Sequence, residues 1–596
     1  MVKKKQCIYC KHSYVANSSG TTTSLTRHLK DCTYFQKAQG NSKGFINFGS
    51  NRSDKTVFID EESSGGFNPM KLCKYLNPLF QKVSRSTITR DCIKVVNVER
   101  ERIKKILKKV DMISLTSDCW TSNQTIGYMC LTAHFVDSDW KLQKLIIGFN
   151  ELAPPHNGEV ISDGILECLI KWGIQDKIGT ITLDNATNND RAAMFLKNNF
   201  QGKGKLHFEG LFFHVRCCAH ILNLMVQDGL GTIEACLLKI REGVKYLRKS
   251  PSRLLRFGEI AISLGISTHR SLCTDVKTRW NSTHRMLESA IHYKRAFQGY
   301  ALRDSNFIWS PASDEWDRAE KVCKLLEVFL KATNLFSGTS YPTSNLFLTE
   351  IFKVKKEIYN AFISDDEFLS GMSVPMYEKF EKYWGEVSVL MSIASILDPR
   401  FKLKSVTWTF ERLYPMEECS SRVEEVKSQL KSIFEKYFNL FKDVTSSSTP
   451  PQSLDEPNPQ GDDFMAYLNS IPLETGQKTE LEVYLEEPIH RSKELKFDVL
   501  MWWRQHSSKF PVLSKLAKDI FGIPITTVAS ESAFSAGGRI LDDYRSSLSK
   551  DMVELLVCGS DWLKSISKTT IKTLAQSAKD EENLDIDVLI PDKSSH

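Results

Sequence analysis

The stretch from residue 112 to residue 229 constrains the fold most, because its apolar residues switch several times between strand-like and helix-like spacing. Strands are expected at 112–118, 128–136, 142–149, 178–183 and 211–215. Helices are expected at 158–172, after residue 185, and at 217–229. Three strands, a helix, a strand, a helix, a strand and a helix is the element order of an RNase H-like α/β domain.

Two aspartates end strands of this predicted domain, Asp118 the first strand and Asp184 the fourth. The two strands are neighbours in an RNase H-like fold, so both carboxylates could reach one pair of metal ions. Mg²⁺ or Mn²⁺ suits oxygen ligands and would stabilise the attacking and leaving oxygens of a phosphodiester displacement. An aspartate at a strand end also often caps a turn, and for either residue alone this explanation is the better one.

A late stretch, Pro524 to Arg539, holds a single acidic residue, Glu531. Small and apolar residues flank it on both sides, which is the pattern of a helix packed into a core. Burying a lone carboxylate costs free energy unless a cation meets it. We therefore expect Glu531 to share the metal site with Asp118 and Asp184.

Five short motifs follow one another along the chain. They are Ser117-Asp-Cys-Trp-Thr-Ser122, Thr182-Leu-Asp-Asn-Ala-Thr187, Arg216-Cys-Cys-Ala-His-Ile-Leu-Asn-Leu224, Thr278-Arg-Trp-Asn-Ser282 and Ala529-Ser-Glu-Ser-Ala-Phe-Ser535. In this order they resemble the motifs of hAT-superfamily transposases, most closely the plant RICESLEEPER and DAYSLEEPER type with its BED finger. The resemblance covers most of the chain. It implies a DDE-type catalytic triad of Asp118, Asp184 and Glu531, in an RNase H-like core split by a large helical insertion.

The same resemblance singles out Cys217, His220 and Trp280 as DNA-binding residues. Cys217 and His220 stand three apart, hence on one face of a helix. In the family this pair lies near the active site and touches DNA. Zinc binding with His214 is one interpretation, and a packed cysteine beside an outward-facing histidine is the one we favour. Trp280 corresponds to a tryptophan that stacks on a flipped base, although a core position explains it equally well.

The first residues carry a four-ligand pattern, with cysteines at 7, 10 and 32 and a histidine at 28. Two ligands from a tight knuckle and two from a short helix suit structural Zn²⁺. The ligands are Cys7, Cys10, His28 and Cys32. Basic residues around them, including Arg27 and Lys30, indicate contact with the DNA backbone. The pattern resembles a BED-type finger without the strand that normally precedes its first cysteine.

Two basic helical stretches, 96–110 and 239–256, are expected either to face solvent or to contact phosphates. Trp502 and Trp503 either close the core or leave an apolar patch for a partner. The acidic tail contains a β-branched run, 585–590, that could add as a strand to SUMO.

The domain boundaries expected from these patterns follow the chain in order. They are 1–35 for the shortened BED-type zinc finger, 36–68 for a linker, 69–110 for a helical DNA-binding or oligomerisation segment, 111–232 for the first part of the RNase H-like core, 233–442 for the all-helical insertion, 443–480 for a disordered linker, 481–566 for the hAT C-terminal dimerisation region that completes the core, and 567–596 for the acidic tail.

The amino-acid composition and the net charge agree with a nuclear DNA-binding protein. Fifteen cysteines dispersed over 596 residues indicate a reducing compartment. The net charge of +7 fits double-stranded DNA, and the start carries three lysines and no apolar signal segment. We expect a domesticated, transposase-derived regulator of gene expression that acts as a homodimer. The alternative is an active transposase that cleaves DNA and transfers strands.

Overall fold

The computed structural model describes residues 83–122, 125–202, 206–446, 478–491, 497–541 and 548–564, and four short strands before them. The chain divides into two compact units, Met1–Lys94 and Val95–His596. In the first unit β1 (Lys4–Gln6) pairs with β2 (Ser13–Val15), and β3 (Lys43–Phe45) with β4 (Phe58–Asp60), both antiparallel.

Several predictions on the terminal segments lie outside the described residues. These are the zinc ligands Cys7, Cys10, His28 and Cys32, the neighbouring Arg27 and Lys30, and the tail run 585–590. Most of the two expected linkers lies outside them as well.

Helix α4 (Arg85–Lys108) spans the boundary between the two units. It begins at Arg85, where the Ser84 hydroxyl accepts the backbone N–H of Thr87 at 3.0 Å. Part of its basic face is used within the protein. The Arg102 Nε donates to the buried Glu99 at 2.8 Å, and the Arg100 guanidinium lies 5.9 Å from the centre of the Trp562 ring.

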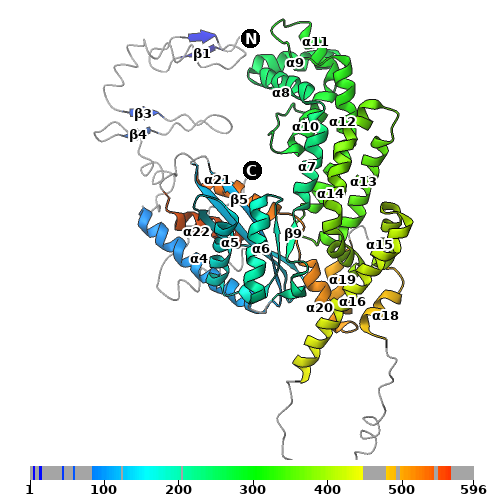
Figure 1. Cartoon of the computed structure of the whole chain (residues 1–596). Coiled ribbons are helices and arrows are strands. Elements are labelled where there is room, and N and C mark those ends of the chain that lie inside the picture. Colours follow the sequence, from blue (N-terminus) through cyan, green and yellow to red (C-terminus); the bar gives the residue numbers. More distant parts are fainter. Residues whose placement is uncertain are drawn as a thin grey trace, which may run out of the picture. The chain divides into compact units, whose positions relative to one another are not determined.

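A mixed sheet of five strands lies beside the long helical region of the second unit (Figure 1). Its strands are β5 (Ile113–Thr121), β6 (Gly127–Val136), β7 (Leu142–Leu152), β8 (Ile178–Leu183) and β9 (His214–Arg216). The spatial order is β7-β6-β5-β8-β9, antiparallel from β7 to β5 and parallel from β5 to β9. Every residue of β6 is buried, so helices must cover both faces of the sheet.

The helices within this region follow local signals in the sequence. They are α5 (Gly158–Trp172), α6 (Thr187–Gly202) and α7 (Cys218–Gly231). Helix α5 has the predicted bounds, since Asn157 caps its first turn and Gly173, at φ 67°, ends it in a left-handed conformation. The fifth strand starts later than expected, because η2 (His207–Gly210) turns the chain first.

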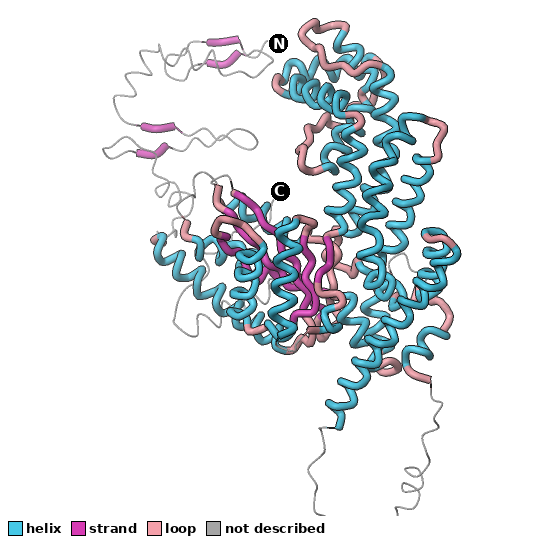
Figure 2. The backbone as a smooth tube through the Cα atoms, viewed as in Figure 1, coloured by secondary structure: helices cyan, strands magenta, loops and turns pink. Residues whose placement is uncertain are grey.

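Between β9 and residue 446, all the regular secondary structure of the described residues is helical, and loops join the helices (Figure 2). After α7 come α8 (Glu234–Arg248), α9 (Pro251–Ser263), α10 (Trp280–His292), α11 (Lys294–Ala301), α12 (Ser313–Phe336), α13 (Phe347–Phe362), α14 (Glu367–Leu397), α15 (Lys402–Leu413) and α16 (Met416–Ser446). The expected all-helical character of 233–442 agrees with this.

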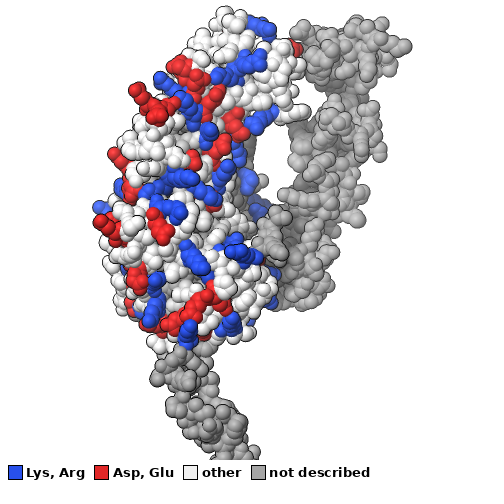
Figure 3. Space-filling view, turned by 90° about the vertical axis from the view of Figure 1, so that its right-hand side faces the viewer, with Lys and Arg blue, Asp and Glu red and all other residues white. Residues whose placement is uncertain are grey.

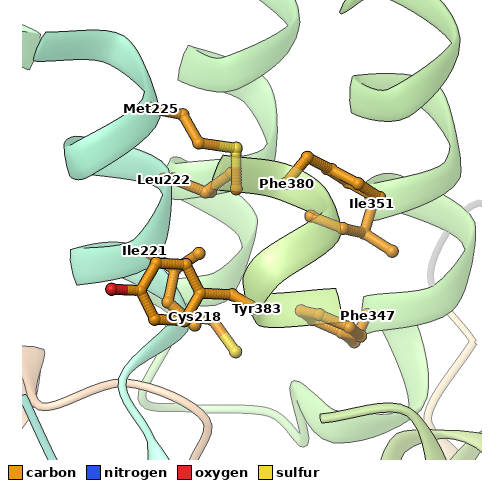
Figure 4. Close-up of a pocket in the computed structure, with 8 residues that line it drawn as sticks. All are labelled: Cys218, Ile221, Leu222, Met225, Phe347, Ile351, Phe380 and Tyr383. Carbon is orange, nitrogen blue, oxygen red and sulfur yellow. The ribbon is translucent and has the colours of Figure 1, made fainter. Parts of the chain in front are cut away.

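Helix α7 joins the sheet to the helical region. Its apolar side meets α13 and α14 around a cavity of about 20 Å³, the size of one water molecule. In Figure 4, side chains from all three helices converge on this space: Cys218, Ile221, Leu222, Met225, Phe347, Ile351, Phe380 and Tyr383. No single helix among the described residues has the length and apolarity to cross a membrane, although α7 and α8 together, bent by 92°, do.

The last described segment returns to the sheet. Its helices are α18 (Glu480–Glu486), α19 (Val499–His506), α20 (Pro511–Phe521), α21 (Val528–Ile540) and α22 (Lys550–Lys564). Trp502 and Trp503 are buried, so they close the core. Helix α22 covers β7, where the Trp562 indole donates to the carbonyl of Ile146 at 2.8 Å and Asp561 accepts its N–H at 2.9 Å.

Candidate functional site

Helix α21 is held on the sheet by buried hydroxyl groups. The Ser530 hydroxyl lies 2.8 Å from that of Thr116 on β5 and 3.3 Å from that of Thr132 on β6. Thr116 in turn lies 3.0 Å from the imidazole Nε2 of His134. Burial lowers the pKa of His134 to about 3, so the imidazole is neutral at physiological pH. Residue 530 is thereby fixed to strands more than 390 residues earlier in the chain.

A second set of contacts fixes the start of α21 beside β8 and β9. The Thr182 hydroxyl donates to the carbonyl of Pro524 at 2.7 Å. The backbone N–H of Thr527 donates to the sulfur of Cys217 at 3.4 Å, and the Thr527 hydroxyl lies 3.3 Å from the same sulfur. Cys217 itself donates its N–H to the carbonyl of Leu183, at the end of β8. These bonds connect Glu531 to the strand that ends next to Asp184.

The two aspartates lie at the same end of the sheet. Thr116 is opposite Thr182 in the parallel β5–β8 pair, and each aspartate follows two residues later. Burial, Glu531 and Asp184 together raise the pKa of Asp118 to about 7, in spite of the 2.8 Å hydrogen bond that it accepts from the N–H of Cys119. The negative charges of Glu531 and Asp184 therefore act on the Asp118 carboxyl through space.

Asp184 also has a local role, as the turn-capping explanation predicted. Its Oδ1 accepts hydrogen bonds from the backbone N–H of Ala186, at 2.9 Å, and from the side-chain amide of Asn189. The next residue, Asn185, has both polar side-chain atoms buried without a hydrogen-bond partner among the described residues. An unsatisfied buried amide is costly, and here it stands directly beside the predicted metal ligand.

Glu531 does not lie in the core, contrary to the prediction. It projects from the exposed side of α21, because the small residues Ala529, Ser530 and Ala533 are the ones that face the sheet. Its carboxylate accepts a 3.3 Å hydrogen bond from Thr527. The expected cost of burying a lone carboxylate therefore does not arise.

The carboxylates fit a divalent cation in donor type and in charge, since oxygen ligands suit Mg²⁺ and a cation would offset the repulsion felt by Asp118. In the structure, however, the three carboxylates are not close enough together to hold one ion. Among the described residues, no three histidine, cysteine, aspartate or glutamate side chains lie close enough together to hold a metal ion. Cys217, His220 and His214 are likewise not close enough together to hold zinc. The Nδ1 of His214 lies 3.9 Å from the carboxylate of Asp190.

A cleft of about 550 Å³ opens beside Glu531. Four helices line it: α7 with His220 and Asn223, α10 with Trp280 and Arg285, α12 with Thr333, and α21 with Glu531, Ser532 and Ser535. Arg279, which precedes α10, also lines the cleft, so two arginines stand on its α10 side. The cleft unites three of the five motifs found in the sequence, and Asp118 and Asp184 do not line it.

Two of the predicted DNA-binding residues are mainly packing residues. Trp280 is only 3% exposed and belongs to the core, with a small part of its ring at the cleft wall. Cys217 is buried, and its sulfur accepts a hydrogen bond from Thr527. His220 is partly exposed at the cleft, which agrees with the favoured interpretation of a packed cysteine and an outward-facing histidine.

The sequence alone did not identify Thr527, Ser530, Asn185 or Arg285 as site residues. The signal for Ser530 was the hydroxyl residues at alternating positions, Ser114 and Thr116 on β5 and Thr180 and Thr182 on β8, since a strand face lined with hydroxyls needs polar partners when it is buried. The basic stretch 239–256 has mainly internal partners. Arg241 forms a buried ion pair with Asp275 at 2.7 Å, and Arg253 stacks over Tyr246 at 3.7 Å.

Comparison with known protein families places four matches along the chain. Their descriptions are ZBED1 RNase-like domain over 116–212, ZBED1 RNase-like helical domain over 215–325, hAT-like transposase, RNase-H fold, over 345–437, and hAT family C-terminal dimerisation region over 480–563. The third of these covers helices here, and β6, β7, β8 and most of β5 lie within the first.

Relatives cover most of the chain. The rice zinc finger BED domain-containing protein RICESLEEPER 2 is 35% identical, over 83% of this chain and 71% of its own length. The rice protein RICESLEEPER 4 is 30% identical over 94% of this chain and 89% of its own length. The Arabidopsis thaliana protein DAYSLEEPER, also a zinc finger BED domain-containing protein, is 30% identical over 84% and 71%.

Proposed function

Because the chain belongs to the hAT transposase family, with the plant RICESLEEPER and DAYSLEEPER proteins as relatives, we propose that it is a nuclear, dimeric DNA-binding protein of transposase descent that regulates gene expression. The observation that carries the proposal is the cleft between α7, α10 and α21. It presents two arginines, two asparagines and a histidine to a ligand, together with the edge of an indole.

The cleft residues match the chemistry of a DNA strand. Arg279 and Arg285 would hold phosphates, which fix register and supply most of the affinity. The Asn223 side chain can donate and accept hydrogen bonds at a base edge, whereas the side-chain oxygen of Asn281 is buried. Trp280 offers a stacking surface to an unpaired base only if the first turn of α10 moves, since most of its ring is buried.

The remaining parts of the proposal rest on the relatives. Zinc held by Cys7, Cys10, His28 and Cys32 would form a BED-type finger, with Arg27 and Lys30 on the DNA backbone. The segment 480–563, described as a dimerisation region, would join two copies. The domain boundaries expected from the sequence are part of this proposal, with 111–232 and 481–566 forming one core around the helical segment.

A second candidate function is an active transposase, and the raised pKa of Asp118 favours it. Carboxylates that crowd together without a countercharge are typical of catalytic metal sites. Asp118, Asp184 and Glu531 would hold Mg²⁺ or Mn²⁺, which would activate water and stabilise the leaving oxygen. Asn189 and the N–H of Ala186 would keep the Asp184 carboxylate in place.

One set of variants separates the two functions. The double variant Arg279→Ala, Arg285→Ala should weaken binding to the DNA that flanks the gene by about tenfold or more, with a salt dependence reduced by about two phosphate contacts. Arg303→Ala, which changes an exposed arginine outside the cleft, is the matched control. Unchanged DNA affinity in the double variant would contradict the cleft as a DNA site.

Asp118→Asn, which lies outside the cleft, should leave DNA binding intact in either case, and Glu531→Gln, which removes a negative charge from the cleft lining, should not weaken it. If Mg²⁺-dependent strand cleavage by the parent protein is measurable and both variants abolish it, the second candidate function is correct. If the parent protein binds DNA but does not cleave it with Mg²⁺ or Mn²⁺, the carboxylates serve binding and fold only.

A further inference from the structure

Helices α13 and α15 share an exposed surface around Trp408, whose side chain is 47% exposed. Two clefts of about 490 Å³ and about 560 Å³ border it, and Phe352 and Trp408 line both. The ring centres of these two residues lie 4.9 Å apart with the planes nearly perpendicular. A large aromatic residue left open between two clefts is a typical anchor of a binding surface.

All the charged residues that line the two clefts beside Trp408 are basic. Six basic residues line the two clefts and no acidic residue does: Lys353, Lys355, Lys356, Arg400, Lys404 and Arg412. Figure 3 shows blue side chains gathered near the middle of the face that contains these helices. Four of the six are paired with carboxylates beside the clefts, Lys353 with Glu350, Lys355 with Glu381, Arg400 with Asp398 and Arg412 with Glu411. Lys356 and Lys404 are exposed.

Cations and rings alternate along both helices. On α15, Lys404, Trp408 and Arg412 follow at intervals of four and so share one face. The Arg412 guanidinium lies 4.1 Å from the centre of the Trp408 ring. On α13, Phe352, Lys356 and Tyr359 form the corresponding row, and Tyr359 is 49% exposed.

We propose that this Trp408 surface binds single-stranded nucleic acid. Alternating cations and flat rings match a chain whose phosphates and bases alternate, and stacking on aromatic or guanidinium planes does not depend on base identity. An acidic peptide is the other anionic partner of suitable shape. Lysine is depleted at protein interfaces, whereas four of the six basic residues here are lysines. The surface uses none of the residues of the Glu531 cleft, so it is independent of the proposed function.

The test uses the full chain and a fluorescently labelled oligothymidylate of about ten nucleotides, with an oligouridylate of equal length as the RNA arm. Trp408→Ala should weaken binding about tenfold or more, and Trp408→Phe should restore most of it. The double variant Lys356→Glu, Lys404→Glu should also reduce the salt dependence by about 0.7 per lost phosphate contact.

Matched controls are Phe438→Ala and Lys324→Glu, which change an exposed aromatic residue and an exposed lysine elsewhere. Photo-cross-linking of a 5-iodouridine oligonucleotide should label peptides of α13 and α15. The proposal is overturned if Trp408→Ala binds the strand like the parent, or if only Arg279→Ala, Arg285→Ala weakens it. It is equally overturned if the Trp408 variants lose affinity for a labelled poly-glutamate peptide and not for the strand.

Discussion

Two junctions fasten the last part of the chain to the rest, and they use opposite chemistry. At the sheet, α21 is held by uncharged groups, the hydroxyls of Thr116, Thr132 and Ser530 beside the neutral His134. We call this set the hydroxyl junction. At the helical region, α18 to α20 are held by buried charges, and we call that set the charged junction.

The charged junction centres on the end of α14. Asp398 is fully buried and accepts hydrogen bonds from the side chains of Asn345, at 2.7 Å, and Arg400, at 2.6 Å. The buried Lys402 donates to the carbonyls of Tyr484 and Glu487 at 2.6 and 3.0 Å and so caps α18. On α20, Asp519 accepts a 2.7 Å hydrogen bond from Tyr437 of α16; Asp519 and Tyr437 complete the charged junction.

The difference between the junctions lies in their response to pH. The folded pKa of His134, about 3, is below its ordinary value of 6.5. Its contribution to stability is therefore complete above pH 6.5 and is lost as the pH falls. Burial raises the folded pKa of Asp519 from 3.8 to about 7. That contribution is complete below 3.8 and is lost as the pH rises through 7.

A fall in pH thus weakens the hydroxyl junction, whereas a rise in pH through 7 weakens the Asp519 contact of the charged junction. The site with the predicted carboxylates is attached to the hydroxyl junction. Its positioning should therefore be constant above neutral pH, where the other junction loosens.

The largest expected effect comes from removing the centre of the charged junction. Asp398→Ala leaves Arg400 and the buried amide of Asn345 without their partner, and the free energy of unfolding should fall by about 3–5 kcal/mol. Asp398→Asn keeps the shape and should lose about half as much. Urea unfolding measures both. Equal losses for the two variants would mean that packing rather than charge holds this junction.

A smaller effect separates the two junctions by pH. Asp519→Asn cannot ionise and still accepts from Tyr437, so near pH 8 it should exceed the stability of the parent protein by on the order of 1–3 kcal/mol. Near pH 5 the difference should be smaller, because the parent carboxyl is then still protonated in the folded state, although it is already ionised in the unfolded state.

Ser530→Ala is the matched variant in the hydroxyl junction. It removes an uncharged hydroxyl, so its loss of about 1–2 kcal/mol should be the same at both pH values. Thermal or urea unfolding of the three proteins at the two pH values gives the comparison. A stability difference for Asp519→Asn that does not vary with pH would show that the two junctions do not differ in this respect.

Both junctions show what the sequence could and could not predict. The strands, α5 and the all-helical segment follow from local periodicity and caps, as Asn157 and Gly173 illustrate. The resemblance in short motifs brought Asp118, Asp184 and Glu531 into one hypothesis, and they do interact electrostatically.

What failed depended on contacts between distant residues. Glu531 was expected in the core because small residues surround it in sequence, but helical geometry turns those residues to the sheet and the carboxylate outward. The partners of Ser530 and Thr527 lie more than 300 residues away, and no local pattern identifies a pairing at that separation. The sequence did not decide whether Trp280 stacks on a base or packs in the core. Its burial in the structure favours packing.

The smallest effect on stability, and a specific one on the site, is expected from Thr527. Its hydroxyl stands between the Cys217 sulfur and the Glu531 carboxylate, 3.3 Å from each. Thr527→Val keeps the shape but cannot donate to Glu531, so apparent Mn²⁺ affinity, measured by electron paramagnetic resonance, should fall about tenfold. Thr527→Ser should retain it, and both variants should unfold within about 1 kcal/mol of the parent. If Thr527→Val binds Mn²⁺ like the parent, Glu531 is positioned by α21 alone, and the hydroxyl junction through Ser530 is sufficient to hold the site.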